Sequence, residues 1–303
     1  MTPLAAGDTV AFIGLGTMGA SMAANVARAG FCLVVQSRTR ERADALVAAG
    51  ATWAPTAAQA VQGARALCLC VPDASDVAAV LFGENGAAAG LAEGAIVIDF
   101  STIAPAPAAA FAARLAEQGV ALLDSPVSGG PKGAAEGTLT CMVGGDRAAF
   151  DTAASLFAAV GRTITHLGPA GSGQVCKAAN QLIICAAMQA AAEGLALGAK
   201  AGLDVEAMRQ ALLGGSARSA VLENHAVRML KESFSPPAFR ASLMRKDIRI
   251  ALEAVQAHGV FAPATAHAAQ MFEAIANQGR ADQDCTVIGQ VVAELSGLPR
   301  LKG

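Results

Sequence analysis

The chain has 303 residues, of which 54% are apolar and 15% charged, and its formal net charge at pH 7 is -2. This composition is typical of a globular protein and lacks the basic excess that binds a nucleic-acid backbone. We therefore expect small molecules or further copies of the chain as partners. The length favours two domains of about 150 residues each.

Several other classes of protein are disfavoured by short-range patterns. The seven cysteines include no C-x-x-C pair and no Cys/His spacing of a zinc site, so we expect reduced, buried thiols and no bound metal. The start, "MTPLAAGDTVAFIGLG", lacks the basic and apolar segments of a signal peptide. Gln189, Glu193 and Lys200 interrupt the longest apolar run, which argues against a membrane helix. We expect a cytoplasmic protein that does not bind membranes.

Secondary-structure patterns divide the chain into two parts. From Thr9 to His166, alanine-rich helical stretches alternate with β-rich runs, namely TVAFIG, CLVVQS, ALCLCV, AIVIDF, VALLDS, LTCMVG and TITHLG. This alternation predicts an α/β fold, a Rossmann-type doubly wound sheet, in residues 1–170. A long apolar helix from Ser172 to Ala201 and further helices predict an all-α domain in residues 171–303, for substrate binding and dimerisation.

A glycine-rich turn joins the first predicted strand to the first predicted helix. It has the G-x-G-x-x-G spacing and comprises Gly14, Leu15, Gly16, Thr17, Met18 and Gly19. In such a turn the first glycine makes the tight bend, the second admits a pyrophosphate, and the third lets helix and strand pack closely. In this context the motif predicts a dinucleotide site, although glycines also end strands for steric reasons alone.

The end of the second strand indicates which dinucleotide is bound. An acidic residue that would hold the ribose 2′-hydroxyl of NAD is expected there, but the chain has Ser37, Arg38 and Thr39. A guanidinium and two hydroxyls suit a 2′-phosphate, so NADP(H) is favoured over NAD(H). The alternative is that Arg38 and the arginines after it form only the solvated start of a helix.

Three polar residues interrupt the long apolar helix on one of its faces. Lys177, Asn180 and Gln181 follow the i, i+3, i+4 spacing, so they can reach one small ligand together. A partly buried lysine has a lowered pKa and can protonate the alkoxide formed when hydride reaches a carbonyl. The alternative is a lysine that extends to solvent.

A second loop could hold a carboxylate. In "DSPVSGGPKGAAEGTLTCMVGG", Ser128, Gly129 and Gly130 follow a strand and expose bare backbone N–H groups. Ligands of doubly wound sheets bind beyond the carboxyl ends of the strands, where this loop would lie. The alternative is an ordinary glycine-rich turn.

Taken in order, five motifs resemble those of the β-hydroxyacid dehydrogenases: GLGTMG, DSPVSGG, GTLTCMVGG, GSGQVCKAANQ and FRASLMRKDIRIALE. The resemblance runs from Val10 to Val292 and implies a Rossmann domain, a helical domain and an active site in the cleft between them. It implies that Lys177 is the catalytic acid/base, that the Ser128 loop binds the substrate carboxylate and that Asn180, with Gln181, binds substrate. The cofactor contacts that it implies are Val71, Pro72, Ser101, Thr102, Phe239 and Lys246.

The pair Asn180 and Gln181 is similar to the branch that reduces tartronate semialdehyde, where many other members carry two asparagines. We therefore predict NADPH-dependent reduction of 2-hydroxy-3-oxopropanoate to D-glycerate, by a homodimer or homotetramer. Alternatives with the same mechanism are a 3-hydroxyisobutyrate dehydrogenase and a reductase of succinate semialdehyde or glyoxylate. A non-catalytic NADP-binding protein and a hydrolase built on Ser128 or Ser125 with His166 and Asp124 are alternatives from other classes.

Overall fold

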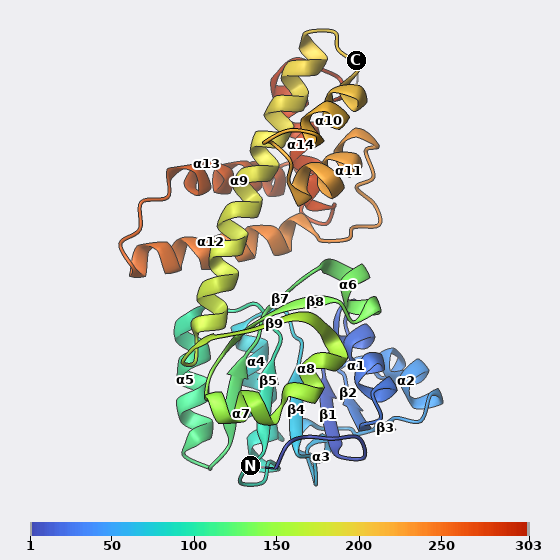
Figure 1. The fold of residues 1–303 in the computed structure, drawn as a ribbon, viewed down its shortest axis with the longest axis vertical. Helices are drawn as coiled ribbons and strands as arrows, with labels where there is room; N and C mark the ends of the chain where they lie inside the picture. The colour runs from blue at the N-terminus through green and yellow to red at the C-terminus, as the bar shows by residue number, and fades with distance from the viewer. Residues whose placement is uncertain (1, 302–303) are drawn as a thin grey trace. The chain divides into compact units, whose positions relative to one another are not determined.

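The computed structural model describes residues 2–301 (Figure 1). They divide into two compact units, the first ending at Lys177 and the second beginning at Ala178. The division falls inside the long helix α9 (Ser172–Lys200), because the first turns of that helix are hydrogen-bonded to loops of the first unit. The sequence-based boundary lay just before this helix, between residues 170 and 171.

One nine-stranded sheet forms the centre of the first unit, in the order β3-β2-β1-β4-β5-β6-β8-β7, with β9 also paired to β8. The strands are β1 (Thr9–Ile13), β2 (Cys32–Gln36), β3 (Thr52–Trp53), β4 (Ala66–Leu69), β5 (Ile96–Asp99), β6 (Ala121–Asp124), β7 (Val127–Ser128), β8 (Leu139–Gly144) and β9 (Gly161–Gly168). Strands β1 to β6 are mutually parallel, whereas β8 runs antiparallel to β6 and β7. The order reverses at β1 and β4, as in doubly wound folds.

The helices of this unit cover both faces of the sheet. They are α1 (Gly19–Arg28), η1 (Arg40–Ala43), α2 (Asp44–Ala48), α3 (Ala57–Ala60), α4 (Ala74–Phe82), η2 (Ala87–Ala89), α5 (Pro105–Ala116), α6 (Gly130–Glu136), α7 (Arg147–Thr152) and α8 (Ala154–Val160). Alternate strand residues point to opposite faces, so both faces of these strands must be apolar. Val10 and Phe12 belong to one core cluster, while Ala11 and Ile13 belong to the other.

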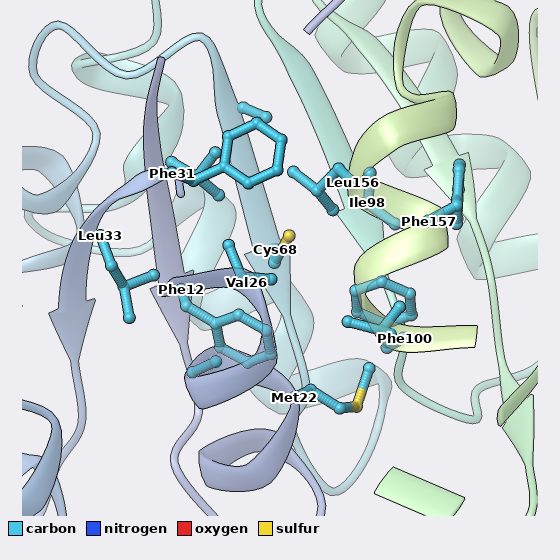
Figure 2. Packing of buried hydrophobic residues seen from close by; sticks show 14 of the residues in the cluster. Phe12, Met22, Val26, Phe31, Leu33, Cys68, Ile98, Phe100, Leu156 and Phe157 are labelled. Atoms are coloured by element: carbon cyan, nitrogen blue, oxygen red, sulfur yellow. The ribbon is translucent and has the colours of Figure 1, made fainter. Parts of the chain in front are cut away.

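The first of these clusters joins the sheet to α1, α6 and α8. Figure 2 shows Phe12 of β1 with Met22 and Val26 of α1, and Phe100 with Phe157 of α8. The ring centroids of Phe12 and Phe100 lie 6.5 Å apart, and those of Phe100 and Phe157, which meet edge to face, lie 6.3 Å apart. The second cluster joins the opposite face to α3, α4 and α5. The predicted doubly wound fold is confirmed.

The second unit is helical within the described residues, where an isolated bridge between Arg240 and Asp284 is the nearest approach to a sheet. Besides most of α9 it contains α10 (Val205–Leu213), a π-helical turn η3 (Val221–His225), α11 (Ala226–Leu230), α12 (Ala241–Ala257), α13 (Pro263–Asn277), η4 (Cys285–Val287) and α14 (Ile288–Leu295). Its core includes Met188 and Leu195 of α9, Ile248 of α12 and Phe272 of α13. The prediction of an all-α second domain is confirmed.

Helix α9 is long and apolar enough to cross a membrane by length and composition alone. Half of its most apolar stretch is buried within the protein, as in the core helices of many soluble proteins. All seven cysteines are free thiols. Burial raises the pKa of Cys70 and Cys141 to about 12, which makes these thiols weak nucleophiles.

Candidate active site

The three glycines of the first loop are required for different reasons. A Cβ on Gly14, where φ is +97°, would lie 2.3 Å from the carbonyl oxygen of Cys70, and a Cβ on Gly19 would lie 1.9 Å from the carbonyl oxygen of Gly14. A Cβ on Gly16 would meet nothing within 4 Å. The protein's own packing therefore explains Gly14 and Gly19, whereas the bare backbone at Gly16 leaves room for a ligand.

The helix that follows this loop starts directly on it, since the N–H of Ala20 donates to the carbonyl oxygen of Gly16 over 3.0 Å. Helix α1 has no side-chain cap at its N-terminus and no acidic residue in its first turn, as far as the described residues show. The dipole of a helix favours a negative charge such as a phosphate at an N-terminus of this kind. Together with the open space at Gly16, these features fit the pyrophosphate of a dinucleotide.

At the end of β2, the Arg38 side chain is 82% exposed. Its guanidinium lies 3.2 Å from the carboxylate of Asp76 in α4, a partner that the sequence analysis did not predict. Arg40 is engaged elsewhere, over the ring of Trp53 and in an ion pair with Asp44. Of these two arginines, Arg38 is therefore the one available to a ligand, in competition with Asp76.

The loops after β4 and β5 are hydrogen-bonded to each other through Ser101, which is buried. The N–H of Val71 donates to Ser101 Oγ over 3.0 Å, and the N–H of Ser101 donates to Asp99 Oδ1 over 2.9 Å. Pro72, which is exposed, and Thr102, which is half-buried, adjoin these two residues. The structure thus brings together four of the residues that the resemblance implied as cofactor contacts.

Gln174, in the first turn of α9, holds that helix against the same loops. It is 1% exposed; its Nε2 donates to the carbonyl oxygen of Ser101 over 2.8 Å, and its Oε1 accepts from the N–H of Ile103 over 3.1 Å. The sequence analysis missed this residue, although it lies within the motif GSGQVCK. Its long-range partners cannot be seen from the local pattern.

Asp124, at the end of β6, fixes the same end of α9. Its two carboxylate oxygens accept from the N–H groups of Gly171 and Gln174, over 2.7 and 3.0 Å. Burial raises the pKa of the Asp124 carboxyl above its ordinary value, and these backbone donors offset part of the rise. Gly173 lets the chains approach closely, since a Cβ there would lie 2.2 Å from the carbonyl oxygen of Met142.

Lys177 follows Gln174 by three residues and is only 8% exposed. Little of this side chain therefore reaches solvent. Lysines are mostly exposed in proteins, so a lysine buried at this position is a candidate for a chemical role. Two buried anchors, Gln174 and Asp124, set the position of the helical turn that carries it.

The Ser128 loop has the expected backbone freedom. Gly129 and Gly130 have φ values of +134° and +63°, which favour glycine, and both are exposed. A Cβ on Gly130 would meet nothing within 4 Å, whereas one on Gly129 would lie 3.0 Å from a methyl carbon of Leu139. Ser128 itself pairs with Thr140 in the antiparallel ladder of β7 and β8.

In the second unit, Asn180 and Gln181 are hydrogen-bonded side by side, with Asn180 Nδ2 donating to Gln181 Oε1 over 2.7 Å. Gln181 Nε2 donates in turn to Asp247 Oδ2, also over 2.7 Å, and Asp247 Oδ1 lies 3.1 Å from the ammonium of Lys246. The N–H of Phe239 donates to a carboxylate oxygen of the buried Asp284. The two contacts made by Asp247 connect Gln181 with Lys246, a link that the sequence alone did not predict.

The hydrolase arrangement is not formed. The carboxylate of Asp124 accepts from backbone N–H groups of α9, while His166 Nε2 bonds with the carbonyl oxygen of Gly145. No group of three or more residues in positions 2–301 has the side chains and geometry to hold a metal ion. The candidate site therefore consists of the anchored Lys177 and the glycine-rich loop that fits a dinucleotide.

Comparisons with known proteins identify the family. Residues 9–168 match a family model described as the NAD binding domain of 6-phosphogluconate dehydrogenase, and residues 171–292 match one described as NAD-binding of NADP-dependent 3-hydroxyisobutyrate dehydrogenase. The 2-hydroxy-3-oxopropionate reductase of Escherichia coli (strain K12) is 42% identical over 93% of this chain and 96% of its own. This chain belongs to the β-hydroxyacid dehydrogenase family. The family predicted from the sequence motifs is thereby confirmed.

Other members of the family show how widely its substrates vary. An NAD-dependent L-serine dehydrogenase of Pseudomonas aeruginosa is 39% identical over 95% of this β-hydroxyacid dehydrogenase and 99% of its own chain. A crystal structure of 3-hydroxyisobutyrate dehydrogenase from Salmonella typhimurium has a TM-score of 0.86 and 29% identity, over 94% of this chain and 99% of that one. The present protein is thus an NAD(P)-binding oxidoreductase, as its sequence predicted.

Proposed function

We propose that this β-hydroxyacid dehydrogenase reduces 2-hydroxy-3-oxopropanoate, tartronate semialdehyde, to D-glycerate with NADPH, and catalyses the reverse reaction. One observation carries the proposal: Lys177 is buried on a helical turn that Gln174 and Asp124 anchor to the loops after β5 and β6. These loops follow the carboxyl ends of parallel strands, the edge of the sheet where ligands bind in doubly wound folds.

The chain's own residues then take separate parts in the reaction. The bound nicotinamide supplies the hydride for reduction and accepts it in oxidation. Lys177 donates a proton to the alkoxide oxygen in reduction and removes it in oxidation. Backbone N–H groups of Ser128, Gly129 and Gly130 hold the substrate carboxylate, and Asn180 contacts the substrate one helical turn beyond Lys177.

The preference for NADPH rests on the end of β2. Ser37, Arg38 and Thr39 offer one guanidinium and two hydroxyls to a 2′-phosphate. The ion pair between Arg38 and Asp76 is a surface pair with an exposed arginine, so breaking it costs about 1 kcal/mol or less. A phosphate can therefore replace the carboxylate as the partner of Arg38.

The deciding experiment compares initial rates of NADPH and NADH oxidation with tartronate, methylmalonate and succinate semialdehydes and glyoxylate. We expect kcat/KM for tartronate semialdehyde with NADPH to exceed the others by about tenfold or more, equivalent to about 1.4 kcal/mol in transition-state binding. Equal or higher values for methylmalonate semialdehyde would favour a 3-hydroxyisobutyrate dehydrogenase, the second candidate, which the structural match supports.

The role of Lys177 is tested by Lys177→Ala, with Lys200→Ala as the control on an exposed lysine of the same helix. We expect Lys177→Ala to lower turnover by about 100-fold or more, the scale of general acid catalysis, while NADPH still binds. Lys200→Ala is expected to keep normal turnover. Near-normal turnover in Lys177→Ala would contradict this role. A non-catalytic binding protein would show no turnover of these aldehydes even in the wild type.

We also propose that the protein is a homodimer or homotetramer. Ile183 and Leu197, on the part of α9 within the second unit, are each 70% exposed, so apolar side chains of this helix face solvent in a single chain. A second copy of the chain would cover them. A monomeric mass by light scattering at micromolar concentration would contradict this proposal.

A further inference from the structure

Four side chains of the second unit form a continuous polar chain. It runs from Lys246 through Asp247 and Gln181 to Asn180, and its three contacts measure 3.1, 2.7 and 2.7 Å. Asp247 and Gln181 are 4% and 3% exposed, so neither can exchange these partners freely for water. Asn180, at the end of the chain, is half-buried.

The direction of hydrogen bonding along this chain is fixed at Asp247. An ionised carboxylate only accepts hydrogen bonds, so Gln181 must turn its amide nitrogen toward Asp247. Its amide oxygen then faces Asn180 and needs a donor, so Asn180 must turn its own amide nitrogen toward Gln181. The carboxylate of Asp247 therefore sets the orientation of the Asn180 amide through Gln181, which contacts both.

Both polar ends of Gln181 are thus occupied within the protein. A buried side chain with both ends occupied is poorly suited to bind substrate directly. Asn180 differs, because one of its N–H groups is committed to Gln181 and its amide oxygen is held on the opposite side of the amide. An oxygen in that position can only accept a hydrogen bond, and its natural partner is a hydroxyl group.

We propose that Gln181 is a positioning residue that holds the Asn180 amide with its oxygen toward the substrate, where it accepts from the substrate's 2-hydroxyl. This inference rests on the proposed function and deepens it, since it names the group that separates a 2-hydroxy aldehyde from a 2-methyl one. A methyl group in place of the hydroxyl leaves the Asn180 oxygen without a donor, and such mismatches discriminate strongly.

The experiment measures the ratio of kcat/KM for tartronate semialdehyde to kcat/KM for methylmalonate semialdehyde, which differ by that hydroxyl. Gln181→Met keeps the length of the side chain but can neither donate to Asp247 nor accept from Asn180. We expect it to lower the ratio by about tenfold or more. The control is Gln189→Met, a buried glutamine on the same helix that bonds to Glu193 and His267, and it should keep the wild-type ratio.

Gln181→Glu adds a test that a merely structural role would not pass. When protonated, the introduced carboxyl can donate to Asp247 and accept from Asn180, as glutamine does; when ionised, it repels Asp247. The ratio for this variant should therefore rise toward the wild-type value as the pH falls, while the ratio for Gln181→Met stays low. This test also decides the question if Gln181→Met does not fold.

The possible failures are distinguishable. A wild-type enzyme that does not prefer tartronate semialdehyde overturns the proposed function and, with it, this inference. A wild-type enzyme that does prefer it, together with an unchanged ratio in Gln181→Met, overturns the positioning role and leaves the proposed function intact. A Gln181→Glu ratio that does not change with pH contradicts the hydrogen-bond direction argued above.

Discussion

Replacing Gln174 by alanine tests whether its amide holds the start of α9 to the sheet. The truncation would leave two buried backbone groups, the N–H of Ile103 and the carbonyl oxygen of Ser101, without the partners that they have at 3.1 and 2.8 Å. Each unsatisfied buried group costs about 1 to 3 kcal/mol. We therefore expect Gln174→Ala to lower the free energy of unfolding by about 2 to 6 kcal/mol.

The assay is urea unfolding followed by circular dichroism, and the control variant is Gln210→Ala. Gln210 is an exposed helical glutamine whose amide donates to Glu206 one turn earlier, over 2.8 Å. Pairs of this kind contribute about 0.2 to 0.5 kcal/mol, so the control should change stability by no more than that. A matched pair of glutamine truncations separates the effect of buried partners from the effect of removing an amide.

The same variant should also lose activity, because Gln174 positions the helical turn that carries Lys177. We expect a lower kcat/KM even at temperatures where Gln174→Ala is fully folded, since small displacements of a catalytic group are costly. If Gln174→Ala loses no more stability than Gln210→Ala, the two hydrogen bonds do not hold the helix as argued, and the account of how Lys177 is anchored fails.

Three further predictions concern the cofactor site and the second unit. Gly16→Ala should keep stability or raise it slightly, by up to about 1 kcal/mol, but weaken NADPH binding. Gly19→Ala should instead destabilise the fold, because its Cβ would overlap the Gly14 carbonyl. Equal effects of the two variants in thermal unfolding and fluorescence titration would contradict this. Arg38→Ala should lower the ratio of NADPH to NADH affinity and Asp76→Asn should raise it, and titrations that show no change in either would exclude this ion pair from cofactor selection. Burial lowers the pKa of His225 below 6.5, so the unfolded chain binds a proton more readily and stability should fall as the pH drops below about 6.5; His225→Gln should remove this part of the acid sensitivity in urea unfolding, and unchanged sensitivity would refute it.

The sequence predicted some features of the sheet and not others. The doubly wound sheet was predictable because each strand must bury both of its faces and therefore reads as an apolar run between helices. The strands β3 and β7, of two residues each, were not predicted, because so few residues carry no periodic pattern. The antiparallel direction of β8 also escaped prediction, since direction depends on how the connecting segment crosses the sheet.

The sequence by itself determined the family, the glycine loop and the face of α9 that carries Lys177, Asn180 and Gln181, because all of these depend on local spacing. Only the tertiary structure decided what lies opposite that face. The partners of Gln174 and Gln181 are 71 and 66 residues away along the chain, and no local pattern specifies contacts at such separations. Hydrogen-bond partners inside a protein are chosen when distant segments pack and exclude water, so the anchoring of Lys177 and the direction of the Asn180 amide became visible only in the folded chain.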